Sequence, residues 1–266
     1  MTRLFTGRFF TGRWWHGWRG WLIFVAVAVI GCIIGGIALA RAFSPAPDPW
    51  SQYPGVPQFS TDQILANQTI EELAPRVDTT MTEIRDAVTK EFGLDWVAQG
   101  APVVAPEPNR YGGTSLLNTY DSVTWQTIGT IRDDTEKKRL VALVTKIMAS
   151  NGFGDPELLN TSGPEGIQDF GGFTLADQGR WVLAGHPPEV SRGNLELTIL
   201  DLTKDRTGIL TAQSDAAVAD LGWEPEYVSI SFRGEFMLSE ADRGEFERRA
   251  ARYAGHIAPV PGRNND

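Results

Sequence analysis

The longest uninterrupted apolar stretch of the 266-residue chain runs from Trp21 to Ala40, twenty residues without a charge. A helix rises about 1.5 Å per residue, so this stretch would be about 30 Å long, the thickness of a bilayer's hydrocarbon core. Four arginines precede it and one follows closely. Since the more basic flank stays in the cytoplasm, the pattern predicts a single-pass anchor in the cell membrane with a cytoplasmic N-terminus and an extracytoplasmic C-terminal part.

Helical periodicity with capping residues marks several stretches after the anchor. Ser60 with Gln63 and Thr69 with Glu72 have the spacing of capping boxes, in which each side chain bonds the backbone N–H of the other residue. Beyond Thr69, apolar residues recur every three or four positions, which is one face of a helix. One expected helix begins at Ser60. The other expected helices cover about Thr69–Gly93, Asp133–Asn151, Ser214–Leu221 and Ser239–Ala254.

A period of two dominates the later part of the chain and predicts strands. Asn194–Leu202 alternates strictly and places Leu195, Leu197 and Ile199 on one face. Strands clustered after a helix favour an α+β fold, here a two-layer sandwich of an antiparallel sheet with helices on one face. Further expected strands are Leu94–Val104, Ser122–Ile128, Ile167–Leu175, Trp181–Gly185, Thr207–Thr211 and Glu226–Phe232.

Composition divides the chain into five segments. Residues 1–20 form a basic, aromatic cytoplasmic segment, and residues 21–42 contain the anchor. Residues 43–59 hold five prolines and predict an extended linker, because proline fixes its own backbone and restrains the preceding residue. Residues 60–258 are expected to fold as one extracytoplasmic α+β domain, and residues 259–266 to form a disordered tail.

The only cysteine of the chain is Cys32, inside the apolar stretch. Val29-Ile30-Gly31-Cys32 matches the short pattern that precedes lipid attachment in bacterial lipoproteins, which makes Cys32 a candidate lipidation site. Eight apolar residues follow Cys32, whereas a lipoprotein turns polar soon after its cysteine, and this favours an uncleaved anchor. Both interpretations place the domain outside the cytoplasmic membrane, and a domain without cysteines suits a bacterial envelope.

The order of elements from Ser122 to Thr203 resembles a known family. A strand leads into an amphipathic helix ending at Asn151, then a strand containing Asp169-Phe170-x-Gly172, and then a hairpin into Leu195–Ile199. With the export signal, this order resembles the LppA-like lipoproteins of mycobacteria and related actinobacteria, over about a third of the chain. The resemblance implies a cell-envelope protein and carries over no functional residue. The apolar run after Cys32 departs from the family's pattern.

Charge excludes one class of partner. The net charge is −9, and the first 42 residues contribute +5, so the remainder carries about −14. Such an acidic domain is not expected to bind nucleic acid, and an anionic membrane surface would not attract it.

Candidate chemistry is sparse. Only His186 and His256 lie outside the membrane region, far apart and without acidic partners at metal spacing, so no metal site or cofactor is expected. No Gly-x-Ser-x-Gly or Ser-x-x-Lys motif supports a hydrolase. Trp125 and Trp181 either fill the core face of the sheet or, if exposed, line a groove for a peptide, glycan or lipid.

These observations favour a non-enzymatic, membrane-anchored envelope domain that binds a partner protein or a wall component. Two alternatives stay open at this point. One is an extracytoplasmic hydrolase of envelope material that uses His186. The other is an accessory subunit of a membrane assembly that contacts its partners through residues 1–20.

Overall fold

The computed structural model describes residues 49–190 and 192–256. The chain divides into Met1–Pro47 and Asp48–Asp266, and all described residues belong to the second unit. This unit is an α+β fold with an antiparallel sheet, as the sequence predicts. The expected anchor at 21–40, Cys32 and the tail at 259–266 lie outside the described residues. Among the helices of the described residues, none is long and apolar enough to cross a membrane.

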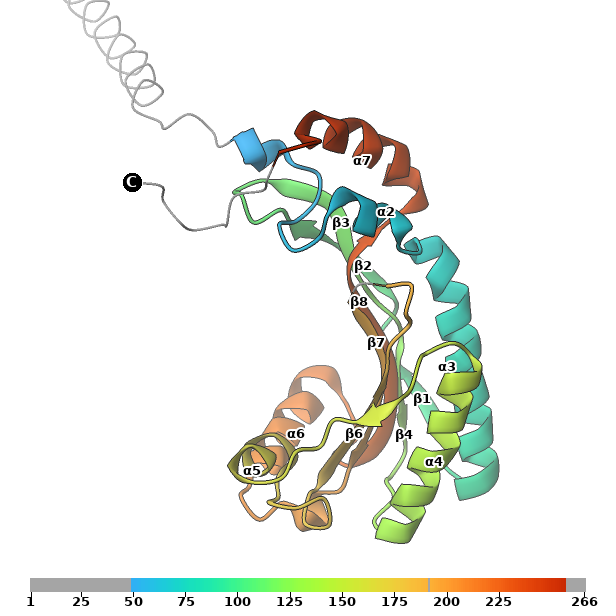
Figure 1. Cartoon of the computed structure of the whole chain (residues 1–266). Coiled ribbons are helices and arrows are strands. Elements are labelled where there is room, and N and C mark those ends of the chain that lie inside the picture. The colour runs from blue at the N-terminus through green and yellow to red at the C-terminus, as the bar shows by residue number, and fades with distance from the viewer. Residues whose placement is uncertain (1–48, 191, 257–266) are drawn as a thin grey trace, which may run out of the picture. The chain divides into compact units, whose positions relative to one another are not determined.

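An eight-stranded sheet forms the centre of this unit (Figure 1). Its main path runs β1-β4-β8-β7-β6-β5, β3 also pairs with β8, and β2 pairs with β3. Every pair of strands is antiparallel. The strands are β1 (Trp96–Gln99), β2 (Val103–Pro108), β3 (Thr114–Asp121), β4 (Thr124–Thr127), β5 (Glu157–Leu158), β6 (Arg180–Gly185), β7 (Gly193–Leu200) and β8 (Tyr227–Leu238).

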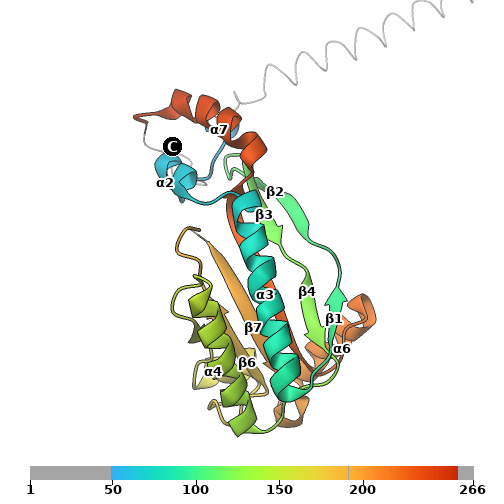
Figure 2. The ribbon, with the colours of Figure 1, turned by 90° about the vertical axis from the view of Figure 1, so that its right-hand side faces the viewer.

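Two long helices, α3 (Ile70–Phe92) and α4 (Asp134–Ser150), cover one face of the sheet (Figure 2). Thr69 and Glu72 form the predicted capping box of α3, and Gly93 ends that helix with φ of 68°, a left-handed conformation that glycine adopts without strain. The apolar stripe of α3, the stripe of α4 and the predicted inward face of β7 together form the main core. The two helices and β7 are therefore confirmed, and the period of each stripe explains which face is buried.

The expectation that helices cover only one face is wrong. Leu210 of α6 (Ile209–Leu221) packs with Leu200 and Tyr227, which point away from the main core. α5 (Pro164–Phe170) and α6 lie across the sheet from α3 and α4 (Figure 1).

Two of the predicted strands are also wrong, because residues that begin or end helices lie in or next to both segments. Ile167–Leu175 was expected to be a strand, but Pro164 opens α5 and Gly171 ends it with φ of 77°. Thr207–Thr211 was expected to be an edge strand, but the Asp205 side chain accepts hydrogen bonds from backbone N–H groups at the start of α6. The first turn of α6 is thereby fixed.

The expected linker at 43–59 is wrong from Pro49 onward. η1 (Pro49–Gln52) and the residues after it pack onto the domain, where Tyr53 and Val56 are buried. They lie beside α2 (Thr61–Ala66) and α7 (Arg243–Ala250) at one end of the sheet (Figure 1). The hydrophobic effect explains this packing, because burial removes the apolar side chains of the proline-rich stretch from water.

A buried asparagine holds this segment in place. Asn109 has no exposed surface, and its Nδ2 lies 2.8, 3.1 and 3.2 Å from the carbonyl oxygens of Ser51, Tyr53 and Trp50. Its Oδ1 accepts from the N–H groups of Tyr111 and Gly113, both at 2.9 Å. One amide therefore joins the loop after β2 to the turn of η1.

The other carbonyls of the segment are also occupied. Tyr253 donates its hydroxyl to the Pro49 oxygen at 2.9 Å, and Arg249 donates to the Gln52 oxygen at 2.9 Å. The Leu116 N–H donates to the Pro54 oxygen at 2.7 Å. All six carbonyls from residue 49 to residue 54 are thus hydrogen-bonded to distant parts of the fold. We call Arg249 of α7 and Tyr253 just after it the C-terminal clasp, because both bond this segment.

Replacing Asn109 with alanine is expected to release this segment while leaving the sheet folded. The substitution leaves three carbonyls without their donor, and each lost hydrogen bond costs about 1 kcal/mol, more for a buried group. Chymotrypsin should then cut after Trp50 or Phe59 at least several times faster than in the wild type. Asn118→Ala, on half-exposed β3, is the control and should be cut at the wild-type rate. Equal cleavage of Asn109→Ala and wild type would contradict the role of this amide.

Candidate functional site

A pocket of about 720 Å³ lies between η1, the residues after it, α2 and α7. One wall is aromatic, with Trp50, Tyr53, Phe59 and Tyr253. Trp50, Phe59 and Tyr253 are half-exposed, whereas Tyr53 is buried beneath them. The ring centroid of Tyr253 lies 4.9 Å from that of Trp50 and 5.1 Å from that of Tyr53, so the three rings pack as one cluster with Tyr53 beneath.

The charged residues of this pocket are all acidic. Asp62 on α2 and Glu247 on α7 line it, and both are exposed. Within residues 49–190 and 192–256, neither carboxylate forms an ion pair. Among the described residues, no lysine or arginine lines the pocket, and Arg249 of α7 donates to the Gln52 carbonyl oxygen. His256 also lines the pocket.

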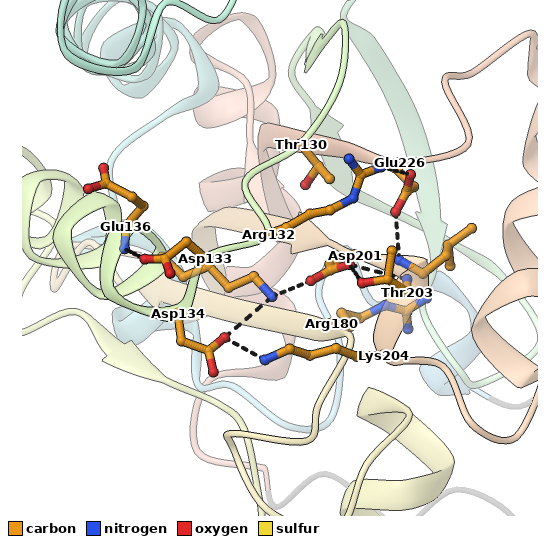
Figure 3. Close-up of polar contacts among 12 residues, drawn as sticks. Thr130, Arg132, Asp133, Asp134, Glu136, Arg180, Asp201, Thr203, Lys204 and Glu226 are labelled. Atoms are coloured by element: carbon orange, nitrogen blue, oxygen red, sulfur yellow. Dashed lines mark hydrogen bonds and ion pairs between the residues drawn. The ribbon is translucent and has the colours of Figure 1, made fainter.

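A second polar cluster lies where α4 begins and β7 ends (Figure 3). Lys137 and Asp201 have no exposed surface, and their Nζ and Oδ2 atoms are 2.7 Å apart. Asp134 lies 3.8 Å from Lys137 and also pairs with Lys204 at 2.5 Å. On its other side, Asp201 accepts from the N–H and hydroxyl of Thr203.

Asp201 is ionised in this setting. Burial alone would raise the pKa of its carboxyl group, but the hydrogen bonds from Lys137 and Thr203 and the lysine charge together hold the pKa below the ordinary 3.8. The Lys137 ammonium also lies 5.7 Å from the centre of the Trp181 ring. The buried positive charge is therefore balanced by a carboxylate and an aromatic face.

This cluster is suited to holding elements together rather than to catalysis. A group that attacks or protonates a substrate must touch it, and Lys137 and Asp201 are both fully enclosed. They connect the first turn of α4 to the turn η2 (Leu202–Lys204) that follows β7. Beside them, Glu226 accepts from the Leu202 N–H at 3.0 Å and pairs with Arg132 at 2.5 Å, which extends the network to the start of β8.

The two tryptophans considered for a groove both face the α3–α4 side of the sheet. Trp181 is 1% exposed and lies in the main core. Trp125 is half-buried, and the guanidinium carbon of Arg85 on α3 stacks 3.6 Å from its ring centroid. Neither side chain lines the pocket beside α7.

The two histidines are also far from any catalytic arrangement. His186 is exposed, and its Nδ1 lies 3.0 Å from the carbonyl oxygen of Gly193, which fixes the proton on that nitrogen. His256 is exposed at the edge of the pocket. Across the described part of the chain, no three His, Cys, Asp or Glu side chains are grouped to hold a metal ion.

The sequence analysis predicted neither the aromatic pocket nor the buried pair of Lys137 and Asp201, although the sequence contains a signal for each. Trp50, Tyr53 and Phe59 lie in a stretch that was taken for a spacer, yet three aromatic residues are costly to leave in water. Lys137 continues the spacing of Leu140 and Val144, so its place on the apolar stripe was a signal for a buried, paired ammonium.

Comparisons with known proteins identify no relative. No family model matches the sequence, no curated protein matches it, and no solved structure matches the fold.

Replacing Lys137 with methionine is expected to lower the free energy of unfolding by about 3–5 kcal/mol, since Asp201 is left as an unpaired buried charge. The double variant Lys137→Met, Asp201→Asn should be more stable than Lys137→Met. Lys138→Met, one residue along on the exposed side, is the control and should change little. Denaturant unfolding measures all three, and equal stability of Lys137→Met and Lys138→Met would contradict the pair.

The same pair predicts a pH dependence. Because the pKa of Asp201 is lower in the folded than in the unfolded protein, its stabilisation is complete above the ordinary value of 3.8 and is lost as pH falls through the lowered pKa. The stability advantage of the wild type over Asp201→Asn should therefore be constant near neutral pH and shrink below about pH 4.

Proposed function

We propose that this chain is a membrane-anchored cell-envelope protein whose extracytoplasmic domain binds a ligand or partner and catalyses no reaction. The pocket beside α7 is the observation that supports the proposal. Its closeness in sequence to the expected anchor supports it as well. It is built from the first residues of the described fold, beginning at Trp50. Concave sites with aromatic walls and a few polar groups are the usual form of a binding site.

The sequence before Pro49 supports a site close to the membrane. Trp21–Ala40 has the length and composition of a spanning helix, and only residues 41–48 separate it from Pro49. Eight residues reach at most about 28 Å, since an extended chain spans about 3.5 Å per residue. The pocket, which begins at Trp50, is therefore close in sequence to the expected anchor.

The absence of a catalytic motif in the sequence supports binding rather than turnover. His186 bonds a backbone carbonyl and has no carboxylate partner among the described residues, and Lys137 and Asp201 are closed to substrate. A cytoplasmic N-terminus, an uncleaved anchor and membership of the LppA-like lipoproteins belong to this proposal as predictions from the sequence.

Cell fractionation tests the location. The full chain with a C-terminal epitope tag is expected in the membrane fraction, and protease added to protoplasts should remove the tag without lysis. Cys32→Ser is the matched variant, because a spanning anchor keeps its mass and location when the thiol is lost, whereas a lipoprotein fails to mature. A tag protected until detergent is added would contradict an extracytoplasmic domain.

A further inference from the structure

The pocket beside α7 joins two features that select for positive charge. Its aromatic wall offers ring faces, which carry negative partial charge and attract cations. Trp50 and Tyr253 present their rings at the surface, 4.9 Å apart, with Phe59 nearby in the same lining. These rings alone would also accept a neutral apolar or sugar ligand, so the charge of the lining must decide.

Both charged side chains of the lining are carboxylates from different elements. Asp62 comes from the first turn of α2, and Glu247 comes from the middle of α7. On the same helix, Glu245 is paired with Arg248, and its pKa is lowered by the hydrogen bond from that guanidinium. Glu247 has no such partner within the described part of the chain, so its charge is directed at the pocket and solvent.

The charge of the described lining disfavours anionic ligands. Phosphate groups of lipids or polymers would meet two carboxylates and, among the described residues that line the pocket, no lysine or arginine. A surface of anionic lipids is disfavoured for the same reason, even though the pocket lies close in sequence to the expected anchor. A ligand that gains from both the rings and the carboxylates is a cation with a flat or apolar surface.

We propose that the pocket binds a basic segment of another envelope protein, with an arginine or lysine side chain seated on the aromatic wall and paired with Asp62 and Glu247. Arginine fits best, because its planar guanidinium stacks on aromatic rings and bonds carboxylates. The inference rests on the proposed binding function and names its partner by charge. The carboxylates determine which ligands enter, and the rings supply most of the contact area.

A charge-matched pair of peptides tests this on the full chain in an uncharged polyoxyethylene detergent. One peptide is acetyl-GSRGRSG-amide, and the other carries citrulline, a neutral isostere of arginine, at both arginine positions. Calorimetric titration is expected to show binding of the arginine peptide, at least fivefold weaker binding of the citrulline peptide, and weaker binding as salt rises from about 50 to about 500 mM.

Variants of the lining locate the effect. Asp62→Asn with Glu247→Gln should weaken the arginine peptide at least fivefold, and Tyr253→Leu should weaken it as well. Asp215→Asn with Asp220→Asn, on exposed positions of α6, removes the same charge far from the pocket and should change affinity less than twofold. Circular dichroism checks that each variant is folded.

Three results would overturn the inference. Equal affinity for both peptides, or equal effects of the two carboxylate double variants, would show that charge does not select the ligand. No binding of the arginine peptide to the wild type would also overturn it. If a trimer of N-acetylglucosamine binds instead and Tyr253→Leu abolishes it, the pocket takes a neutral sugar, and the proposed binding function stands without the basic partner. A tag protected in protoplasts would remove the proposed function itself.

Discussion

The side-chain amide of Asn109 is the contact on which the candidate site depends. It joins three carbonyls of residues 50–53 to the loop that follows β2, and Gly113 allows the close approach, since a Cβ there would lie 1.8 Å from the Ser51 oxygen. With Tyr253 and Arg249 of the C-terminal clasp, it turns an apparent spacer into one wall of a pocket. Residues 49–54 and the pocket are therefore parts of one structure.

Charge is used in two ways within this fold. At the base of α4, Lys137 and Asp201 are buried and matched, which fixes how the helix meets the end of β7. At the opposite end, Asp62 and Glu247 are exposed and unmatched within the described residues, and they face a pocket with aromatic walls. A buried charge must be paired inside the protein, whereas an exposed charge is solvated by water and stays available to a ligand. The unmatched carboxylates are therefore the charges available to a ligand.

The sequence predicted elements wherever local chemistry and period agreed. The capping boxes at Ser60 and Thr69, the stripe of α3 and the alternation of β7 are all confirmed. The strand predicted at Ile167–Leu175 is wrong because the apolar run is short, and Pro164 before it and Gly171 within it begin and end a helix. β3 was missed because its strand signal is weak, and its place depends on pairing with β8, a contact far away in the sequence. The pocket could not be predicted for the same reason, since its two sides are about 190 residues apart.

The central claim is that residues 49–54 belong to the fold and form the pocket with α7. Spin labels at Gln52→Cys and Arg252→Cys, both exposed positions, in a Cys32→Ser background measure it directly by pulsed dipolar spectroscopy on the full chain. The account predicts one narrow distance distribution, because Gln52 is bonded to Arg249 and Pro49 to Tyr253. Adding Asn109→Ala should broaden it. A broad distribution in the otherwise unaltered chain would contradict the account.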